Sequence, residues 1–369
     1  MLKKIVHVII DRPLNSCHPE HPDILYKLNY GYIPSFFSSV DYEELDAYIM
    51  GVEEPISEYM GEVIAILHRF NEEDKLIVAN KRFSKKEIIS QTYFMEQYFS
   101  SYIEMAYPTQ EDILFDLKNA GLKSTDTVFI HSSLKSFGSM DGKELLSALK
   151  VFFKEGLVIF PTHTWSTIQE DGDVYDASST KACVGALPNL ALRDLDFKRS
   201  MHPTHSVCAF GKDNEEYLKL DLNQNTPVSP TGCTGSLWVY GAKILFAGVP
   251  QSKNTFIHSI EEEMLVPDRF TDKIYHFKSL GMGVELDYYM PRHFSTKRDH
   301  LSENYAKLLS HFLEHGIATQ AYIGNSLTTI VDAKACRAYV KYLLSKNIHI
   351  FDDDKEFVDN YEGCKEAKQ

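Results

Sequence analysis

The chain has few cysteines for its length, and their spacing is irregular. Six cysteines lie at positions 17, 183, 208, 233, 336 and 364 of 369 residues, and no two of them form a C-x-x-C pair. This distribution argues against a cysteine-based zinc site and against a disulfide framework. It predicts a protein of the reducing cytoplasm.

The chain also lacks long hydrophobic runs. Its longest apolar stretches, such as KILFAGVP and GLVIFP, have the length of a strand, far below the roughly 20 apolar residues of a membrane-spanning helix. The apolar run near the start is followed at once by Asp11 and Arg12, with no small-residue cleavage site. We therefore expect a buried strand there rather than a signal peptide, and no membrane partner.

An excess of positive charge is absent as well, since the formal net charge is −14. This argues against nucleic acid as a partner, because phosphate binding requires clustered lysine and arginine. An acidic chain would attract a cationic substrate over long range. Acidity that serves solubility alone explains the same charge equally well.

The length and the 44% hydrophobic content predict two domains, each with its own core. Residues 1–106 alternate strands and turns and end in a helical pattern over 84–106, in which Ser84 and Glu87 form a capping box. We expect a small β-barrel with a C-terminal helix. The segment YPTQE at 107–111 is the expected boundary.

Residues 107–355 alternate helical and strand patterns, which predicts a layered α/β domain. The remaining residues, 356–369, are mostly polar and are expected to form a frayed tail. Ligands of α/β domains bind beyond the strand ends. Chemistry-bearing residues should therefore be sought there.

The segment KRSMHPTHSVCAFG, residues 198–211, has two histidines around a proline that leads into an apolar run. Such a turn can hold the imidazole of His202 or His205 at the edge of a sheet, where it would act as a base near neutral pH. The alternative is a turn whose histidine makes only structural hydrogen bonds. Cys208, inside the apolar run, is interpreted as packing.

Three other segments carry similar signals. His131, Ser132 and Ser133 end one strand pattern, and His163 and Trp165 end another; capped turns are the ordinary alternative. In NTFIHSIEEE, residues 254–263, helical spacing would bring His258 and Glu261 onto one face. A solvated acidic helix face is the alternative there.

Taken in order, these segments resemble the aminoglycoside 3-N-acetyltransferase family, over about residues 110–344. The resemblance is carried by FIHSSLKSFG, FPTHTW, VGALPNLALR, KRSMHPTHSVCAFG, NTFIHSIEEE and AYIGNSLTTIVDAKA. It implies an acyltransferase that moves an acetyl group from acetyl-coenzyme A to an amine of a small molecule, an aminoglycoside or another amino sugar. Antibiotic resistance is the associated function.

The resemblance also implies roles for individual residues. His202 would be the general base, and His258 and Glu261 would contact the amine or orient that base. The coenzyme would lie against His131, Ser132, Ser133, Leu134, Ser206 and Thr255. The acceptor would lie against Asp176, His163, Trp165, Asn254 and His205.

The first domain is similar to a truncated soluble inorganic pyrophosphatase, in IIDRPLN, NYGYIPSF and DYEELD. This resemblance implies that Asp41, Glu43 and Asp46 could gather a divalent metal such as Mg²⁺ on oxygen ligands. Tyr98-Phe99 stands where that family has Tyr-Lys, so we expect a degenerate domain that serves packing, homodimerisation or substrate capture. Two alternatives to aminoglycoside acetylation follow: acetylation of a nucleotide-linked amino sugar in surface-glycan biosynthesis, and metal-dependent phosphate hydrolysis.

Overall fold

The computed structural model describes residues 1–38, 40, 42–293 and 301–363. The chain divides into two compact units. The first combines Met1–Asn119 with the short segments Phe137–Glu144 and Tyr322–Ser326, and the second contains the rest. The first unit extends past the expected boundary because helix α2 (Gln110–Asn119) is tied to it through the ammonium of Lys85, which lies 2.5 Å from the Asp116 carboxylate. A boundary between independently folding domains at 107–111 stays a prediction.

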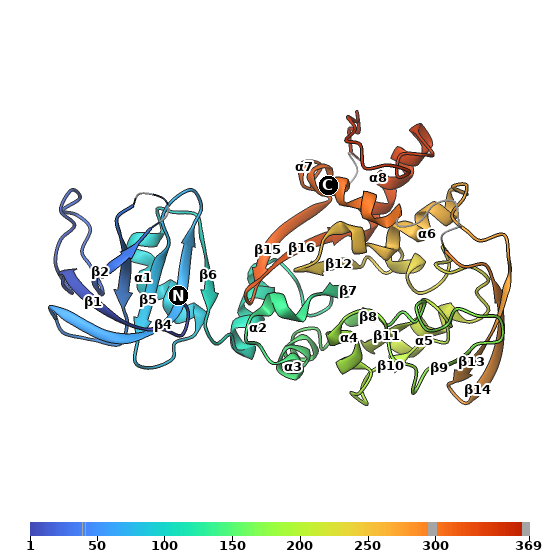
Figure 1. The fold of residues 1–369 in the computed structure, drawn as a ribbon, viewed down its shortest axis with the longest axis horizontal. Helices are drawn as coiled ribbons and strands as arrows, with labels where there is room; N and C mark the ends of the chain where they lie inside the picture. Colours follow the sequence, from blue (N-terminus) through green and yellow to red (C-terminus); the bar gives the residue numbers. More distant parts are fainter. Residues whose placement is uncertain (39, 41, 294–300, 364–369) are drawn as a thin grey trace. The chain divides into compact units, whose positions relative to one another are not determined.

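The first unit is built on a closed ring of five strands, β1-β2-β3-β5-β4 and back to β1 (Figure 1). The strands are β1 (Ile5–Arg12), β2 (Asn29–Phe37), β3 (Glu44–Ile49), β4 (Glu58–Arg69) and β5 (Lys75–Ala79). Closure depends on the length of β4, because Glu58–Glu62 pairs with β1 while the following residues pair with β5. The predicted β-barrel is confirmed.

The helix expected over 84–106 is shorter than predicted. Helix α1 (Lys85–Glu96) begins with the predicted capping box at Ser84 and Glu87 but ends at Glu96, whose carboxylate is held by Arg69 at 2.7 Å. The chain then forms strand β6 (Ser101–Met105), which pairs antiparallel with β4. The prediction is wrong here because the partner strand is distant in sequence, and local periodicity does not report such pairing.

The second unit contains a seven-stranded mixed sheet in the order β10-β11-β8-β7-β12-β16-β15 (Figure 1). Its centre is parallel, with β7 (Thr127–Ser132) between β8 (Leu157–Pro161) and β12 (Lys243–Ala247). The flanking strands β11 (Val207–Gly211) and β16 (Ser326–Asp332) are antiparallel to it. The central strands are almost wholly buried, as expected where both faces of a parallel sheet are covered.

Other elements of this unit are the two edge strands of the sheet and the helices. They are β10 (Lys198–Arg199), β15 (Ala318–Ile323), α3 (Gly142–Phe152), α4 (Ala186–Ala191), α5 (Asn214–Leu218), α6 (Thr255–Glu263), α7 (Leu308–Glu314) and α8 (Ala333–Lys346). A second sheet contains β9 (Val174–Asp176), β13 (Tyr275–Gly281) and β14 (Val284–Met290). Within the described residues, no helix combines the length and apolar character needed to cross a bilayer.

The tail after α8 differs from the expectation of a frayed end as far as residue 363. It has no regular secondary structure, yet Phe357 and Tyr361 pack against the main core and Asp359 bonds to Tyr339. Val358, between them, is 97% exposed. Composition alone does not show this, because the anchoring aromatic residues are sparse among charged ones.

Candidate active site

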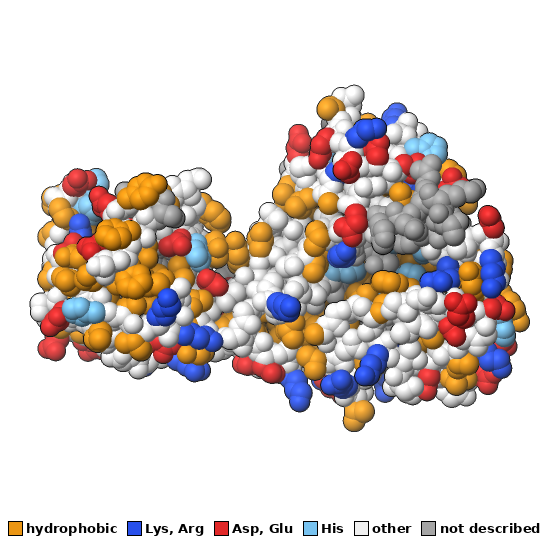
Figure 2. Space-filling view, in the orientation of Figure 1, with side chains coloured by type: hydrophobic (Ala, Val, Ile, Leu, Met, Phe, Trp, Pro, Cys, Tyr) orange, Lys and Arg blue, Asp and Glu red, His pale blue; other side chains and the backbone are white. Residues whose placement is uncertain are grey.

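A cavity of about 550 Å³ lies at the carboxyl ends of the three parallel strands. Its wall includes His131 and Ser132 from the end of β7, His163 just after β8, and Ser252 after β12. This is the edge where open α/β sheets bind ligands. Figure 2 shows histidine side chains in a hollow on the face of the second unit.

Five histidines of the described residues line this cavity, and four of them form a connected row. The ring centroids of His163 and His205 lie 4.9 Å apart, those of His205 and His293 5.5 Å, and those of His293 and His258 4.6 Å. His131 stands at the end of β7, where burial lowers its pKa to about 3. Burial, reinforced by neighbouring imidazoles, also holds the pKa values of His163 and His205 well below the usual range. The rings of His131, His163 and His205 are neutral at pH 7.

His258 has the surroundings of a general base. It lies on α6 with Glu261 one turn further on, and its Nδ1 is 3.2 Å from Oε2 of that carboxylate. Burial lowers the pKa of His258 more than the hydrogen bond and charge of Glu261 raise it, so the net direction is down. A neutral imidazole on a cavity wall can accept a proton.

Glu261 is fully buried and held from two further sides. The Nε of Arg269 donates to its Oε1 at 2.8 Å, and the hydroxyl of Tyr305 donates to its Oε2 at 2.5 Å. Burial by itself raises the pKa of Glu261, but the hydrogen bond from His258, the Arg269 charge and Tyr305 together lower it below its usual range. An ionised, immobile carboxylate therefore stands behind His258.

His202, the predicted base, does not have this environment. Its Nε2 donates to the carbonyl of Thr226 at 3.0 Å, and its Nδ1 accepts the backbone N–H groups of Thr204 and His205 at 3.3 and 2.9 Å. His202 is 2% exposed and is not among the described residues that line the cavity. These hydrogen bonds indicate that His202 stabilises the turn at residues 202–205. The role of base predicted for His202 stays a prediction, and these contacts do not favour it.

Several buried polar atoms of the cavity wall have no hydrogen-bond partner in the described structure. They are Nε2 of His131, Oγ of Ser132, Nε2 of His163 and Oγ of Ser252. Buried polar groups in folded proteins are nearly always satisfied, by protein or by a bound molecule. This part of the wall therefore fits a ligand rich in polar groups, such as the pantetheine and phosphate portions of a coenzyme.

The predicted site residues divide into two groups. The cavity wall brings together His131, Ser132, His163, Trp165, His205, Thr255 and His258, with Glu261 directly behind. The remaining residues predicted from the resemblance are not part of that wall: Ser133, Leu134, Asp176, His202, Ser206 and Asn254.

Local hydrogen bonds explain two of the absences. Ser206 is fully buried and donates to the carbonyl of Thr162 at 2.8 Å. The carboxylate of Asp176 accepts hydrogen bonds from Ser178 and Ser179, and the Ser178 bonds lower its pKa. Both side chains organise their own segments.

The charge of the described cavity wall does not follow the acidity of the whole chain, from which we expect attraction of a cationic substrate. Among its described lining residues, the cations are Lys253 and Arg292 and the one carboxylate is Glu303. Glu303 lies 2.9 Å from Lys253, so it is partly neutralised. The described wall is suited to anionic as well as cationic groups.

The carboxylates proposed for metal binding in the barrel are only partly described. Asp41 lies outside the described residues, and Glu43 is exposed. Asp46 is 2.7 Å from the ammonium of Lys75 and accepts a hydrogen bond from Tyr30 at 2.5 Å. Lys75 also contacts Glu73. A buried ammonium thus already supplies the positive charge that a Mg²⁺ ion would bring.

Comparison with known proteins identifies the family of the second unit. A sequence model described as aminoglycoside 3-N-acetyltransferase matches residues 129–345, which is more than half of the chain. The chain therefore belongs to the aminoglycoside 3-N-acetyltransferase family, and the predicted resemblance is confirmed.

Individual relatives agree with this assignment. The SPbeta prophage-derived aminoglycoside N(3')-acetyltransferase-like protein YokD of Bacillus subtilis (strain 168) is 26% identical over 181 residues, which cover 42% of this chain and 64% of YokD, slightly less than two thirds of its length. The structure of AAC-IIIb with CoASH is similar with a TM-score of 0.56 and 20% identity, over 64% of this chain and 96% of that one. The structure of a mutant of AAC(3)-IVa in complex with a gentamicin is similar with a TM-score of 0.56 and 21% identity, over 66% of this chain and 90% of that one. At these identities the structures show a common fold.

Sequence reasoning missed three important residues. His293 and Arg292 line the cavity from a segment without helical or strand periodicity, and Tyr305 reaches Glu261 from a 3₁₀ helix (Leu301–Lys307). A histidine and an arginine side by side in MPRHF were the available signal, but nothing in one sequence shows that they face the strand ends.

Proposed function

We propose that this protein transfers an acetyl group from acetyl-coenzyme A to an amino group of an aminoglycoside or a related amino sugar. The observation that carries the proposal is the pair of His258, on the wall of the 550 Å³ cavity, and the buried carboxylate of Glu261 behind it. Family membership and the fold shared with AAC-IIIb, whose structure holds CoASH, support acetyl-coenzyme A as the acetyl donor.

His258 serves as the general base in this proposal. An alkylammonium has no lone pair, so the acceptor reacts as the neutral amine. As its nitrogen bonds to the thioester carbonyl carbon, it gives up one proton, the C–S bond breaks, and the coenzyme leaves as a thiolate, which that proton then converts to the thiol. Since ionised Glu261 accepts the hydrogen on Nδ1 of His258, the lone pair is on Nε2, which takes the proton of the amine. Such base assistance is worth roughly 10²–10⁴-fold in rate.

The unsatisfied polar atoms of His131, Ser132 and Ser252 are proposed to hold the coenzyme, and Lys253 and Arg292 to attract its phosphates. Trp165 is 46% exposed at the cavity and offers an apolar face to a sugar ring. We place the acceptor on that side. The layered arrangement of the second unit is, in this proposal, the acetyltransferase scaffold.

The cavity charge favours a second candidate acceptor. Among the described lining residues the one carboxylate, Glu303, is paired with Lys253, which leaves little negative charge for a polycationic aminoglycoside. A nucleotide-linked amino sugar, the runner-up substrate class from the sequence, therefore remains a proposed alternative for the same chemistry.

One assay tests both candidates. Thiol release from acetyl-coenzyme A is measured with gentamicin, apramycin and a uridine-diphosphate amino sugar as acceptors, beside phosphate release from pyrophosphate with Mg²⁺. We expect amine-dependent thiol release, and the preferred acceptor identifies the substrate class. Phosphate release without thiol release from any amine would overturn the proposal.

A further inference from the structure

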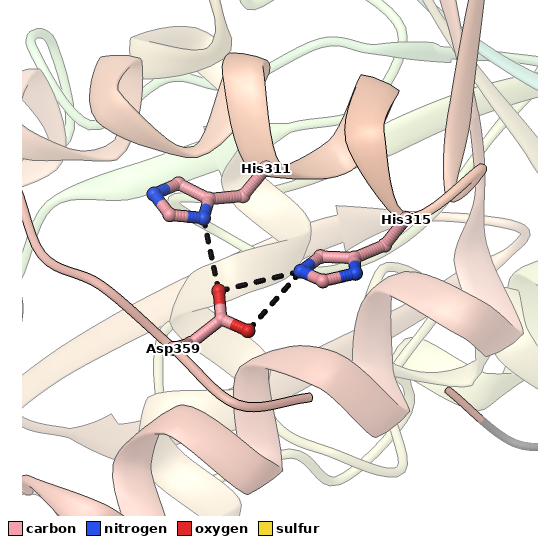
Figure 3. A group of neighbouring side chains, drawn as sticks. All are labelled: His311, His315 and Asp359. Atoms are coloured by element: carbon pink, nitrogen blue, oxygen red, sulfur yellow. Dashed lines mark hydrogen bonds and ion pairs between the residues drawn. The ribbon is translucent and has the colours of Figure 1, made fainter. Parts of the chain in front are cut away.

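Helix α7 and the C-terminal tail bring two histidines and one carboxylate together, outside the cavity described above (Figure 3). His311 and His315 are four residues apart, which places them on one face at the end of the helix. Asp359 reaches them from the tail, 44 residues beyond His315. The figure shows both rings directed toward the carboxylate.

The surrounding side chains hold these groups in position. The ring of His311 stacks on Phe357, with centroids 4.2 Å apart and planes 3° from parallel. His315 packs edge-on against Tyr361 at 5.5 Å. The hydroxyl of Tyr339 donates to Oδ2 of Asp359. Fixed rings and a hydrogen-bonded carboxylate are the support that metal ligands commonly have.

The distances suit a metal ion with short bonds to nitrogen and oxygen. Nδ1 of His311 is 2.9 Å from Oδ2 of Asp359, and Nε2 of His315 is 3.1 Å from Oδ1. Ligand atoms of a tetrahedral zinc site, at bonds of about 2.0–2.2 Å, lie roughly 3.4 Å from one another. All the candidate ligand atoms here fall within 4.8 Å of one another.

The three side chains of this group are only slightly exposed to solvent. They are 12%, 18% and 5% exposed, so the group is protected yet open to solvent for a water ligand. Two imidazoles and one carboxylate suit borderline divalent ions such as Zn²⁺ and Co²⁺ better than Mg²⁺ or Ca²⁺. Among the described residues, no other three histidines, cysteines or carboxylates meet in this way.

We propose that His311, His315 and Asp359 bind one divalent transition-metal ion of the zinc class, with water in the remaining position. The metal pins the tail segment 357–361 onto α7 and α8. Asp359 lies beyond residue 345, where the match to the family ends, whereas both histidines lie within the match. The proposal does not depend on the acetyltransferase activity.

Zinc titration of the chelator-treated full-length protein, in competition with a chromogenic chelator, tests the site. We expect one tightly bound equivalent in the wild type. Asp359→Asn and His315→Gln retain groups that can hydrogen-bond across the contact but lose a ligand, and each should weaken this binding by about 100-fold or more. His276→Gln, which removes an exposed histidine paired with Asp287 at 2.6 Å, is the matched control and should bind zinc normally.

Two further measurements separate a metal site from a purely hydrogen-bonded contact and from the cavity histidines. Co²⁺ should give the intense visible absorption of a tetrahedral site in the wild type and not in Asp359→Asn. Zinc should raise the thermal unfolding temperature of the wild type but not that of Asp359→Asn. The absence of tight zinc binding, or its persistence in both ligand variants, would overturn the proposal.

Discussion

Nδ1 of His258 lies 3.2 Å from Oε2 of Glu261, and the hydroxyl of Tyr305 contacts both atoms, at 2.9 and 2.5 Å. This arrangement fixes which ring nitrogen carries the hydrogen, because a carboxylate accepts and does not donate. In the proposed mechanism, this fixes the orientation of His258 before substrate binds. The first two predictions follow from it.

Removing the hydroxyl of Tyr305 should impair catalysis without weakening substrate binding. In Tyr305→Phe the ring that packs beside His258 is retained, but Glu261 loses one hydrogen bond. A bond to a charged group is worth about 1.5–3 kcal/mol, so we expect kcat to fall by about 10-fold or more, with the KM for acetyl-coenzyme A unchanged. Steady-state thiol release measures both constants.

Tyr289→Phe serves as the control, since that tyrosine is 61% exposed on β14. An unchanged kcat in Tyr305→Phe would show that the hydroxyl does not position the base.

The pH profile should report the balance of forces on His258. Burial lowers its pKa and Glu261 raises it, with a net value below 6.5. The acid limb of kcat/KM should therefore have its midpoint below pH 6.5, because His258 must be neutral to accept a proton.

In Glu261→Gln the carboxylate that raises the pKa of His258 is lost. The acid limb of the kcat/KM profile should therefore move to still lower pH, and kcat should fall. A midpoint that moves upward, or does not move, would contradict the pairing of these two residues.

The residues at the strand ends are predictable from the sequence, whereas their roles are not. His131 lies near the end of β7, His163 follows β8, and His258 lies within α6, and such regular elements have a periodicity that a single sequence displays. The turn motif around His202 predicts a base. Its ring is instead occupied by backbone groups of Thr226, Thr204 and His205, and such contacts depend on loop geometry.

The fold shows the same division. The closed barrel and the α/β alternation are predictable because hydrophobic patterning reports burial. Local periodicity predicts a helix where strand β6 forms. It also does not show that Phe357 and Asp359 are anchored. Both features depend on contacts with residues that are distant in the sequence.

Acid should destabilise the second unit through its buried neutral histidines. His131 has a pKa of about 3 in the folded state, against about 6.5 when unfolded. The unfolded chain takes up this proton as the pH falls below 6.5, so stability is lost progressively between pH 6.5 and 3. Between pH 7 and pH 5, the protonation of this histidine in the unfolded chain should lower the free energy of unfolding by about 2 kcal/mol.

Urea unfolding of the wild type and of His131→Gln at pH 7 and pH 5 measures this contribution. The sequence contains two tryptophans, Trp165 and Trp238, both in the second unit, so their fluorescence follows that unit alone. From pH 7 to pH 5, the free energy of unfolding should fall in both proteins, and the fall should be about 2 kcal/mol smaller in His131→Gln than in the wild type. Equal losses would show that His131 is protonated in the folded state.

The assignment of the base is tested most directly by comparing kcat for His258→Asn and His202→Asn in the thiol-release assay. Our account predicts that kcat falls by about 10²–10⁴-fold in His258→Asn, while His202→Asn keeps kcat within an order of magnitude and loses stability. Near-normal turnover in His258→Asn, with turnover abolished in a folded His202→Asn, would contradict it.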